Sequence, residues 1–231
     1  MSTALTRVEA SAAVEEIGWR YLVGTLVTSV AVASLAEAVD LAARALQASG
    51  PDVDAHLKAD VRPDRLELTL QTIASGCLTA RDIELANAIT KALNGRTAGA
   101  ITTAEARSVQ VLEIAIDALD IPAIRPFWRA VMGYVDEPEY DGADNAVIDP
   151  ARQGPTIWFQ QMDAPRPQRN RIHFDIIVSH DEADARVAAA LAAGGHLVSD
   201  AQARAFWVLA DPEGNEICVC TWQDRESGQP D

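Results

Sequence analysis

Leu112-Glu113-Ile114-Ala115-Ile116 has a counterpart about 60 residues later, Ile172-His173-Phe174-Asp175-Ile176. Each stretch places an apolar residue at every second position, which is the period of a half-buried strand. Each stretch is followed by an acidic residue, an amphipathic helical pattern and glycine. Each copy then has an Asp-Pro turn that leads into an apolar strand; the two turns are Asp149-Pro150 and Asp211-Pro212. Because both copies run as strand, helix and three strands, the sequence predicts a duplicated βαβββ unit over residues 109–223.

Two further stretches carry a family resemblance. Phe127-Trp128 lies in the first predicted helix of this unit, and Asp211-Pro212-Glu213-Gly214-Asn215-Glu216 spans the second Asp-Pro turn. Together with the duplication, they resemble the vicinal oxygen chelate superfamily, and most of all its glyoxalase-like branch. The resemblance implies a cleft for a small metabolite. It also implies two competing functions: lyase, isomerase or dioxygenase chemistry, or binding of a small molecule, such as a cationic antibiotic, without turnover.

Strand alternation predicts which side chains of this unit face the cleft. Successive side chains of a strand point to opposite faces, so the residues between packed apolar ones share one face. In residues 111–117 and 171–178 we expect the apolar residues, Leu112 and Ile172 among them, to pack against the helices. The predicted cleft residues are Glu113, Trp158, Gln160, Arg171, His173, Asp175 and Cys218.

The resemblance implies a divalent metal ion as the cofactor of this cleft. In metal-dependent members of the superfamily, four strands supply one ligand each. Glu113 and His173 stand at two of these places, Cys218 replaces the usual Glu at a third, and the fourth falls on Trp158 or Gln160. Carboxylate, imidazole and thiolate together can hold zinc as a three-ligand site. The predicted metal ligands are therefore Glu113, His173 and Cys218.

A metal-free interpretation of the same residues stays open. His173 and Asp175 are two residues apart on one strand, so their Cα atoms lie roughly 6.5 Å apart, and the carboxylate can orient or charge the imidazole. With Glu113 as the acid–base partner across the cleft, the predicted catalytic residues are His173, Asp175 and Glu113. A pocket that only binds a small molecule is the third alternative. In both metal-free cases the predicted ligand-binding residues are Trp158, Gln160, Arg171 and Cys218.

Residues 1–95 form a second mixed α and β region. The leucines at 66, 68 and 70 alternate with polar residues as in a half-buried strand. Thr79, with Asp82 three residues later, is typical of a helix N-terminus. The stretch Gly76-Cys77-Leu78-Thr79-Ala80-Arg81-Asp82-Ile83-Glu84-Leu85-Ala86 is the most specific part of a resemblance to the pterin-4a-carbinolamine dehydratase family, which covers about residues 6–93. The resemblance implies a four-stranded antiparallel sheet with helices on one face. The predicted fold class is therefore α+β for both parts of the chain.

The catalytic histidines of the dehydratase family are absent from this sequence. By the resemblance, a His-His pair precedes the Pro-Asp step and a third His follows the 66–72 strand. This chain has Ser49-Gly50 and Ile73 at those places, and such side chains cannot exchange protons near neutral pH as His does. We therefore expect this domain to be non-catalytic, with 4a-hydroxytetrahydrobiopterin dehydratase as the disfavoured alternative. His56 does not fall on the motif and is expected at the surface.

The net charge of the chain limits the kinds of molecule that we expect it to bind. The chain has 231 residues and a formal net charge of −15 at pH 7; residues 109–231 hold nine basic and 21 acidic residues, a net charge of −12. This charge argues against binding to nucleic acid or to an anionic membrane and suits a small cationic ligand. Small and polar residues at 96–108 are predicted to link a domain at 1–95 to a domain at 109–231.

Location and assembly are expected from three further features. No apolar run approaches the roughly 18 residues of a spanning helix, and the start of the chain lacks a basic segment followed by an apolar one. Three cysteines, a sparse and odd number, indicate reduced thiols. We therefore expect a cytoplasmic protein. Both resembled families commonly self-associate, so we expect a homodimer or a larger homo-oligomer.

Overall fold

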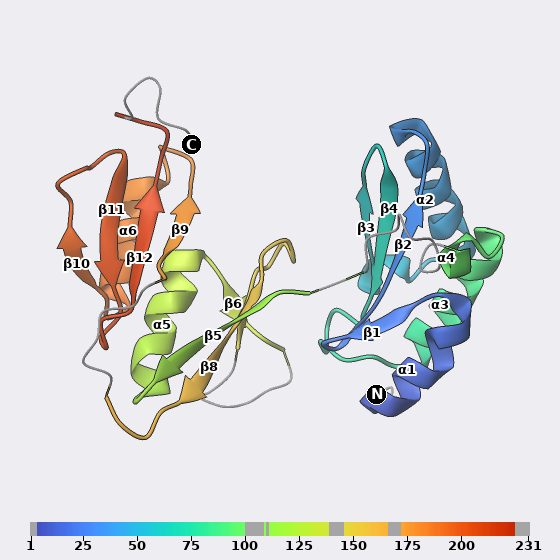
Figure 1. Ribbon diagram of the computed structural model, residues 1–231, viewed down its shortest axis with the longest axis horizontal. Coiled ribbons are helices and arrows are strands. Elements are labelled where there is room, and N and C mark those ends of the chain that lie inside the picture. Colours follow the sequence, from blue (N-terminus) through green and yellow to red (C-terminus); the bar gives the residue numbers. More distant parts are fainter. Residues whose placement is uncertain (1–3, 100–108, 110, 139–145, 166–171, 225–231) are drawn as a thin grey trace. The chain divides into compact units, whose positions relative to one another are not determined.

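The computed structural model describes residues 4–99, 109, 111–138, 146–165 and 172–224, and the chain divides into two compact units, Met1–Val111 and Leu112–Asp231 (Figure 1). The first unit continues beyond residue 95, where we expected the linker to begin. A short helix, α4 (Arg96–Gly99), belongs to it because Thr97 is buried and donates a hydrogen bond to the Ile17 carbonyl. In the described part of the chain, no helix is both long and apolar enough to cross a membrane.

The first unit is built on a four-stranded antiparallel sheet in the order β1-β2-β4-β3. Gly24 makes the tight turn between the first two strands with φ +74°, a conformation that glycine adopts without strain. The predicted alternation on β4 is confirmed, since its three leucines are fully buried while the residues between them are half-buried. The strands are β1 (Arg20–Leu22), β2 (Thr25–Ala31), β3 (Leu57–Val61) and β4 (Arg65–Leu70).

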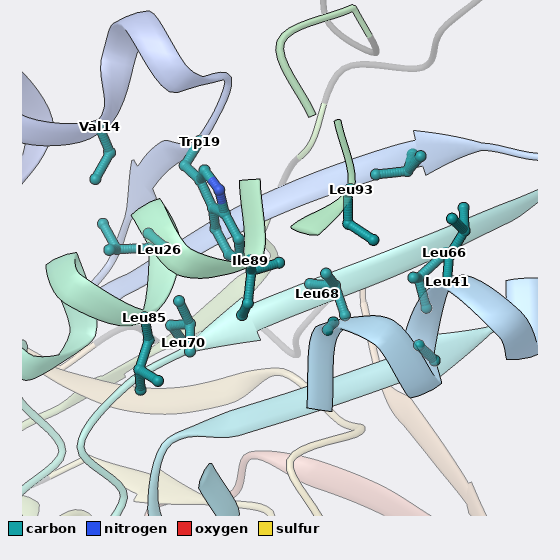
Figure 2. Packing of buried hydrophobic residues seen from close by; sticks show 14 of the residues in the cluster. Val14, Trp19, Leu26, Leu41, Leu66, Leu68, Leu70, Leu85, Ile89 and Leu93 are labelled. Carbon is teal, nitrogen blue, oxygen red and sulfur yellow. The ribbon is translucent and has the colours of Figure 1, made fainter. Parts of the chain in front are cut away.

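Helices cover one face of this sheet and enclose its core (Figure 2). Ser34 and Thr79 begin the two longest helices, and each side chain accepts a hydrogen bond from the backbone N–H three residues on. The sheet with helices on one face agrees with our expectation, and the dehydratase family itself stays a prediction. The helices are α1 (Arg7–Val14), α2 (Leu35–Ser49) and α3 (Ala80–Ala92), with two 3-10 turns, η1 (Glu15–Ile17) and η2 (Val53–Ala55).

The second unit contains the predicted duplication. Its two four-stranded sheets have the orders β5-β8-β7-β6 and β10-β11-β12-β9, so each copy pairs its first strand with its last. Both of these pairings are parallel, and the other strand pairs are antiparallel. The first copy comprises β5 (Glu113–Ala118), α5 (Ile121–Met132), β6 (Val135–Asp136), β7 (Val147–Ile148) and β8 (Thr156–Gln161); the second comprises β9 (Phe174–Ile177), α6 (Ala183–Ala192), β10 (His196–Ser199), β11 (Phe206–Ala210) and β12 (Glu216–Cys220).

One hydrophobic core joins the two copies, with α5 packed against α6. The Asp-Pro turn of the second copy also holds the first one by hydrogen bonds. Asp211 is fully buried and accepts from the Trp128 indole N–H at 2.9 Å. Glu213 accepts from the backbone N–H groups of Leu119 and Asp120, at the N-terminus of α5. The turn that carries the family signature therefore fixes one copy to the other.

Gly195 gives a prediction about this shared core. A Cβ atom at this position would overlap the buried Phe127 ring and lie 3.0 Å from the Ala190 carbonyl oxygen. We expect Gly195→Ala to lower the free energy of unfolding by about 1–3 kcal/mol, because a packed core absorbs added volume poorly. Urea unfolding measures the change, and Ala192→Ser at an exposed position of α6 is the control. Equal stability of the two variants would contradict the close approach.

Candidate functional site

The pairing of β9 with β12 forms the candidate site. The parallel register places Asp175 opposite Cys218. Phe174 and Ile176 pack into the core, so His173, just before β9, and Asp175 lie on the opposite face of the sheet. Residues from the beginning and the end of one copy thus become neighbours.

Three different metal-binding groups meet at this place. The His173 Nε2 atom lies 3.5 Å from the Asp175 Oδ1 atom. With the Cys218 sulfur, the ligand atoms all lie within 4.8 Å of one another. His173 and Asp175 are exposed, with 60% and 53% of their side chains accessible, whereas Cys218 is buried. The site is therefore open to solvent on one side and closed by the thiol on the other.

The thiol of Cys218 is held in its protonated form. Burial raises its pKa to about 12, and its hydrogen bond to Asp175 and the negative charge of that carboxylate add to the shift. A low-dielectric site beside a carboxylate disfavours a second negative charge. Cys218 therefore becomes a thiolate near neutral pH only where a cation offsets that charge.

The donor set fits a metal ion such as zinc. Imidazole nitrogen, carboxylate oxygen and thiolate sulfur are the ligand types that zinc uses, and about 2.0–2.3 Å is the usual distance from each to the metal. Around one tetrahedral ion, such ligand atoms lie roughly 3.4–3.8 Å from one another. The 3.5 Å between the His173 Nε2 and Asp175 Oδ1 atoms falls in this range, and the Cys218 sulfur lies within 4.8 Å of both atoms.

Glu113, an expected ligand, is not part of this group of three. In the described ranges, the group of His, Cys, Asp and Glu side chains that converges contains Asp175 where we expected Glu113. The physical reason is that alternation fixes the face on which a residue lies, but not its distance from a residue in another sheet. Asp175 and Cys218 are direct neighbours in one sheet, whereas Glu113 begins β5 in the other.

Glu137, which we did not predict, is the electrostatic neighbour of Glu113. Burial raises its pKa, Arg152 opposes the shift, and the charge of Glu113 adds to it. Glu137 directly follows β6, whose last residue, Asp136, pairs with Arg125 and Arg129 of α5. A strand of two residues gives no recognisable period in the sequence, so no pattern indicated Glu137.

Of the remaining predicted site residues, the structure describes two and leaves one outside the described ranges. Trp158 and Gln160 both lie on the exposed face of β8, opposite Ala115 and Asp117, while the residues between and before them are buried. Trp158 keeps 38% of its surface exposed. Arg171 lies outside the described residues. The structure thus supplies an aromatic side chain on the open face of the first copy and a metal-type donor set on that of the second.

Two of the alternation predictions are wrong. Leu112 and Ile172 were expected to pack against the helices, yet they are 67% and 72% exposed. The strands begin only at Glu113 and Phe174, so the alternating pattern in the sequence extends one or two residues beyond the backbone that obeys it.

Comparison with known proteins relates the second unit to one family. Residues 113–220 match the family model described as a glyoxalase-like domain. This part of the second unit is therefore similar to glyoxalase-like domains. A search of the curated proteins finds no match.

Solved structures of similar fold each cover about half of the chain. A glyoxalase/bleomycin resistance protein/dioxygenase family enzyme from Burkholderia phytofirmans PsJN is 20% identical, with 47% of this chain and 95% of that chain covered and a TM-score of 0.39. The fosfomycin resistance protein FosX from Listeria monocytogenes is 12% identical, with 52% and 96% covered and a TM-score of 0.40. A glyoxalase-related enzyme from Fulvimarina pelagi is 17% identical, with 49% and 88% covered and a TM-score of 0.40.

Proposed function

We propose that the second unit binds one divalent metal ion, zinc by its donor set, through His173, Asp175 and Cys218, and that it converts a small metabolite at this site. The observation that carries the proposal is the convergence of these three donors on one face of a glyoxalase-like domain. Three protein ligands leave a coordination position open, which is the arrangement of catalytic rather than structural zinc sites. When bound, such an ion supplies Lewis-acid polarisation of a substrate oxygen.

The chain's own residues have separate roles in this proposal. Cys218 closes the buried side of the site, and the exposed His173 imidazole lies at its rim. Asp175 lies between them and interacts with both. Glu137 has a raised pKa, so it keeps a proton to a higher pH than an ordinary glutamate and can pass it to a developing negative charge. Trp158 offers the apolar surface that a metabolite's carbon skeleton needs.

Binding without turnover is the second candidate function, and a separate observation favours it. Trp158, on the exposed face of β8, and Ile177, on the same face of β9 as Asp175, are 38% and 69% exposed. Residues 109–231 carry a net charge of −12, which attracts cations to this unit. A protein that only sequesters an apolar cation needs no open metal position. Loss of the metal would then leave ligand binding unchanged.

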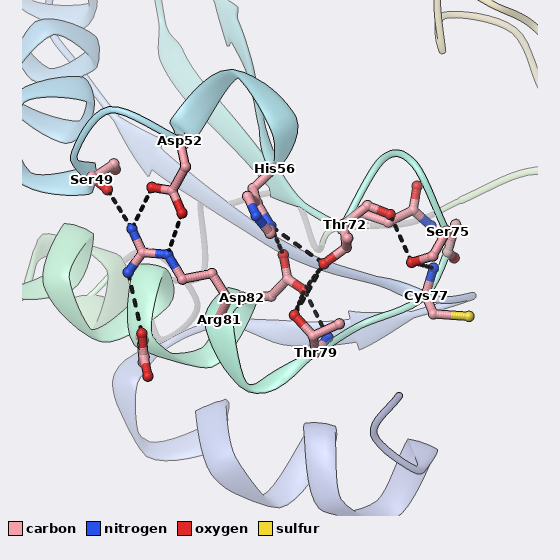
Figure 3. Close-up of polar contacts among 12 residues, drawn as sticks. Ser49, Asp52, His56, Thr72, Ser75, Cys77, Thr79, Arg81 and Asp82 are labelled. Carbon is pink, nitrogen blue, oxygen red and sulfur yellow. Dashed lines mark hydrogen bonds and ion pairs between the residues drawn. The ribbon is translucent and has the colours of Figure 1, made fainter. Parts of the chain in front are cut away.

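For the first unit we propose that pterin dehydration is absent. At the position of the family's histidine pair, the Ser49 hydroxyl donates to the Ala45 carbonyl. Arg81 donates to the Ser49 carbonyl and pairs with Asp52 (Figure 3). These groups hold the loop in place, and none of them replaces the missing imidazoles.

A zinc titration tests the metal proposal. We expect calorimetry on the metal-free full chain to give one zinc site, and we expect His173→Ala to weaken binding about 100-fold, because a lost metal ligand is not replaced. Thermal stability without metal should change little, since His173 is exposed. His196→Ala, which removes an exposed imidazole on β10, is the matched control. Equal zinc affinity in both variants would overturn the site.

A further inference from the structure

His56 is buried, although we expected it at the surface. It is 8% exposed, and its Nδ1 atom lies 2.8 Å from the Asp82 Oδ1 atom (Figure 3). The backbone explains the difference. The η2 turn ends at His56, and the His56 carbonyl accepts a hydrogen bond from the Gln71 N–H. These contacts place the His56 side chain over the beginning of α3.

Asp82 is fixed from several sides. It is fully buried, and its Oδ2 atom accepts hydrogen bonds from the Thr79 backbone N–H at 2.7 Å and from the Thr72 hydroxyl at 2.8 Å. The Thr79 hydroxyl adds a third at 3.1 Å. The other oxygen, Oδ1, is directed at His56. The carboxylate therefore cannot turn away from the imidazole without breaking the cap of α3.

The second ring nitrogen of His56 faces water. Among the described residues, no hydrogen-bond partner for Nε2 is present, and no buried side-chain nitrogen or oxygen lacks a partner. It follows that Nε2 is an accessible atom on an otherwise buried ring. A carboxylate acceptor at Nδ1 favours the tautomer that has its proton on Nδ1 and its lone pair on Nε2.

From this geometry we infer that the first unit carries a reactive site of its own, in which His56 Nε2 accepts protons from, or attacks, small uncharged molecules. A carboxylate that orients one ring nitrogen and leaves the other free is the arrangement of a general base or nucleophile. A carboxylate at this distance from the ring disfavours the approach of anions. Nearby Arg81 is already paired with Asp52 and Glu84, so it does not offset this preference.

The probe is 4-nitrophenyl acetate, an uncharged ester. The Nε2 lone pair forms a bond to the acetyl carbon, and the carbon–oxygen bond breaks with its electrons on 4-nitrophenolate. Asp82 balances the charge of the acetylated ring. Water then cleaves the nitrogen–carbon bond, which releases acetate, passes protons to solvent and restores neutral His56.

Four histidines are present in the chain, so the test isolates one of them. The rate of nitrophenolate release is measured for the full chain with His173→Gln, His180→Gln and His196→Gln, so that His56 is the one histidine left in that variant. Adding His56→Gln should then reduce the rate by about tenfold or more. Gln can still donate to Asp82 but cannot exchange protons, and circular dichroism checks that it folds. A triple variant that reacts no faster than buffer would overturn the inference.

A measurement on the unaltered chain guards against misfolding of the variant. Diethyl pyrocarbonate acylates an accessible, unprotonated imidazole nitrogen, and peptide mapping locates the product. We expect His56 to be acylated in the native protein. Acylation of His56 only after unfolding in urea would overturn the inference, whatever the variants do. Nitrogen-15 spectra of the ring should show the proton on Nδ1, and Asp82→Asn should move it toward Nε2.

Discussion

The affinity of the second unit for zinc is expected to rise about 100-fold between pH 6 and pH 8. The cause is Cys218, whose pKa is raised to about 12, so its thiol is protonated throughout this range. Zinc binds the thiolate, and therefore each binding event displaces one proton from sulfur. Raising the pH by one unit lowers proton competition tenfold, so binding tightens as pH rises and weakens as it falls.

Substitution of Cys218 isolates this effect. We expect Cys218→Ala to weaken zinc binding at pH 8 and to remove the part of the pH dependence that comes from the thiol. Cys220→Ala, two residues further along the same strand and also buried, is the matched control and should keep the full slope. The measurement is the zinc dissociation constant at several pH values in buffers of equal ionic strength. An unchanged slope in Cys218→Ala would exclude the thiol as a ligand.

Asp211→Ala should produce the largest loss of stability among single substitutions in the second unit. Besides the Trp128 indole, Asp211 accepts from the backbone N–H groups of Glu213 and Asn215, each at 2.9 Å, and from the Asn215 side-chain amide at 2.8 Å. Alanine leaves these donors without their acceptor, and one of them, the Trp128 indole N–H, is buried. We expect the free energy of unfolding to fall by about 3–5 kcal/mol, because one unsatisfied buried group costs about 1–3 kcal/mol.

Urea unfolding followed by tryptophan fluorescence measures this loss, because Trp128 reports on the affected core. Asp200→Ala, which removes an exposed carboxylate just after β10, is the control. Trp128→Phe removes the indole donor alone, so a double-mutant cycle with Asp211→Ala gives their coupling. A loss no greater than that of the control would show that the turn does not hold the two copies together.

The sequence alone predicted those structural elements that depend on residues close together in the chain. The strand at residues 66–70, the cap at Thr79 and the repeated βαβββ order all follow from patterns within a few residues. The polar face of β9 was predicted for the same reason. Two-residue strands such as β6 have no period, so Glu137 was missed.

Distances across elements could not be predicted in this way. The choice between Glu113 and Asp175 as a neighbour of Cys218 depends on which strands pair, and the pairing is set by packing of the whole unit. His56 shows the same limit. Nothing near residue 56 in the sequence points to Asp82, which is 26 residues away and reaches it only through the folded sheet and helix.

The two copies differ at one equivalent pair of strand positions. The pairing of Asp175 with Cys218 on β9 and β12 has an equivalent on β5 and β8, where Ala115 lies opposite Trp158. The same backbone geometry therefore presents two metal-type donors in one half of the molecule and a methyl group with an indole in the other. A duplication of identical halves would have created two equal sites. Because the residues at these two positions differ, one copy presents donor atoms and the other copy presents a hydrophobic surface.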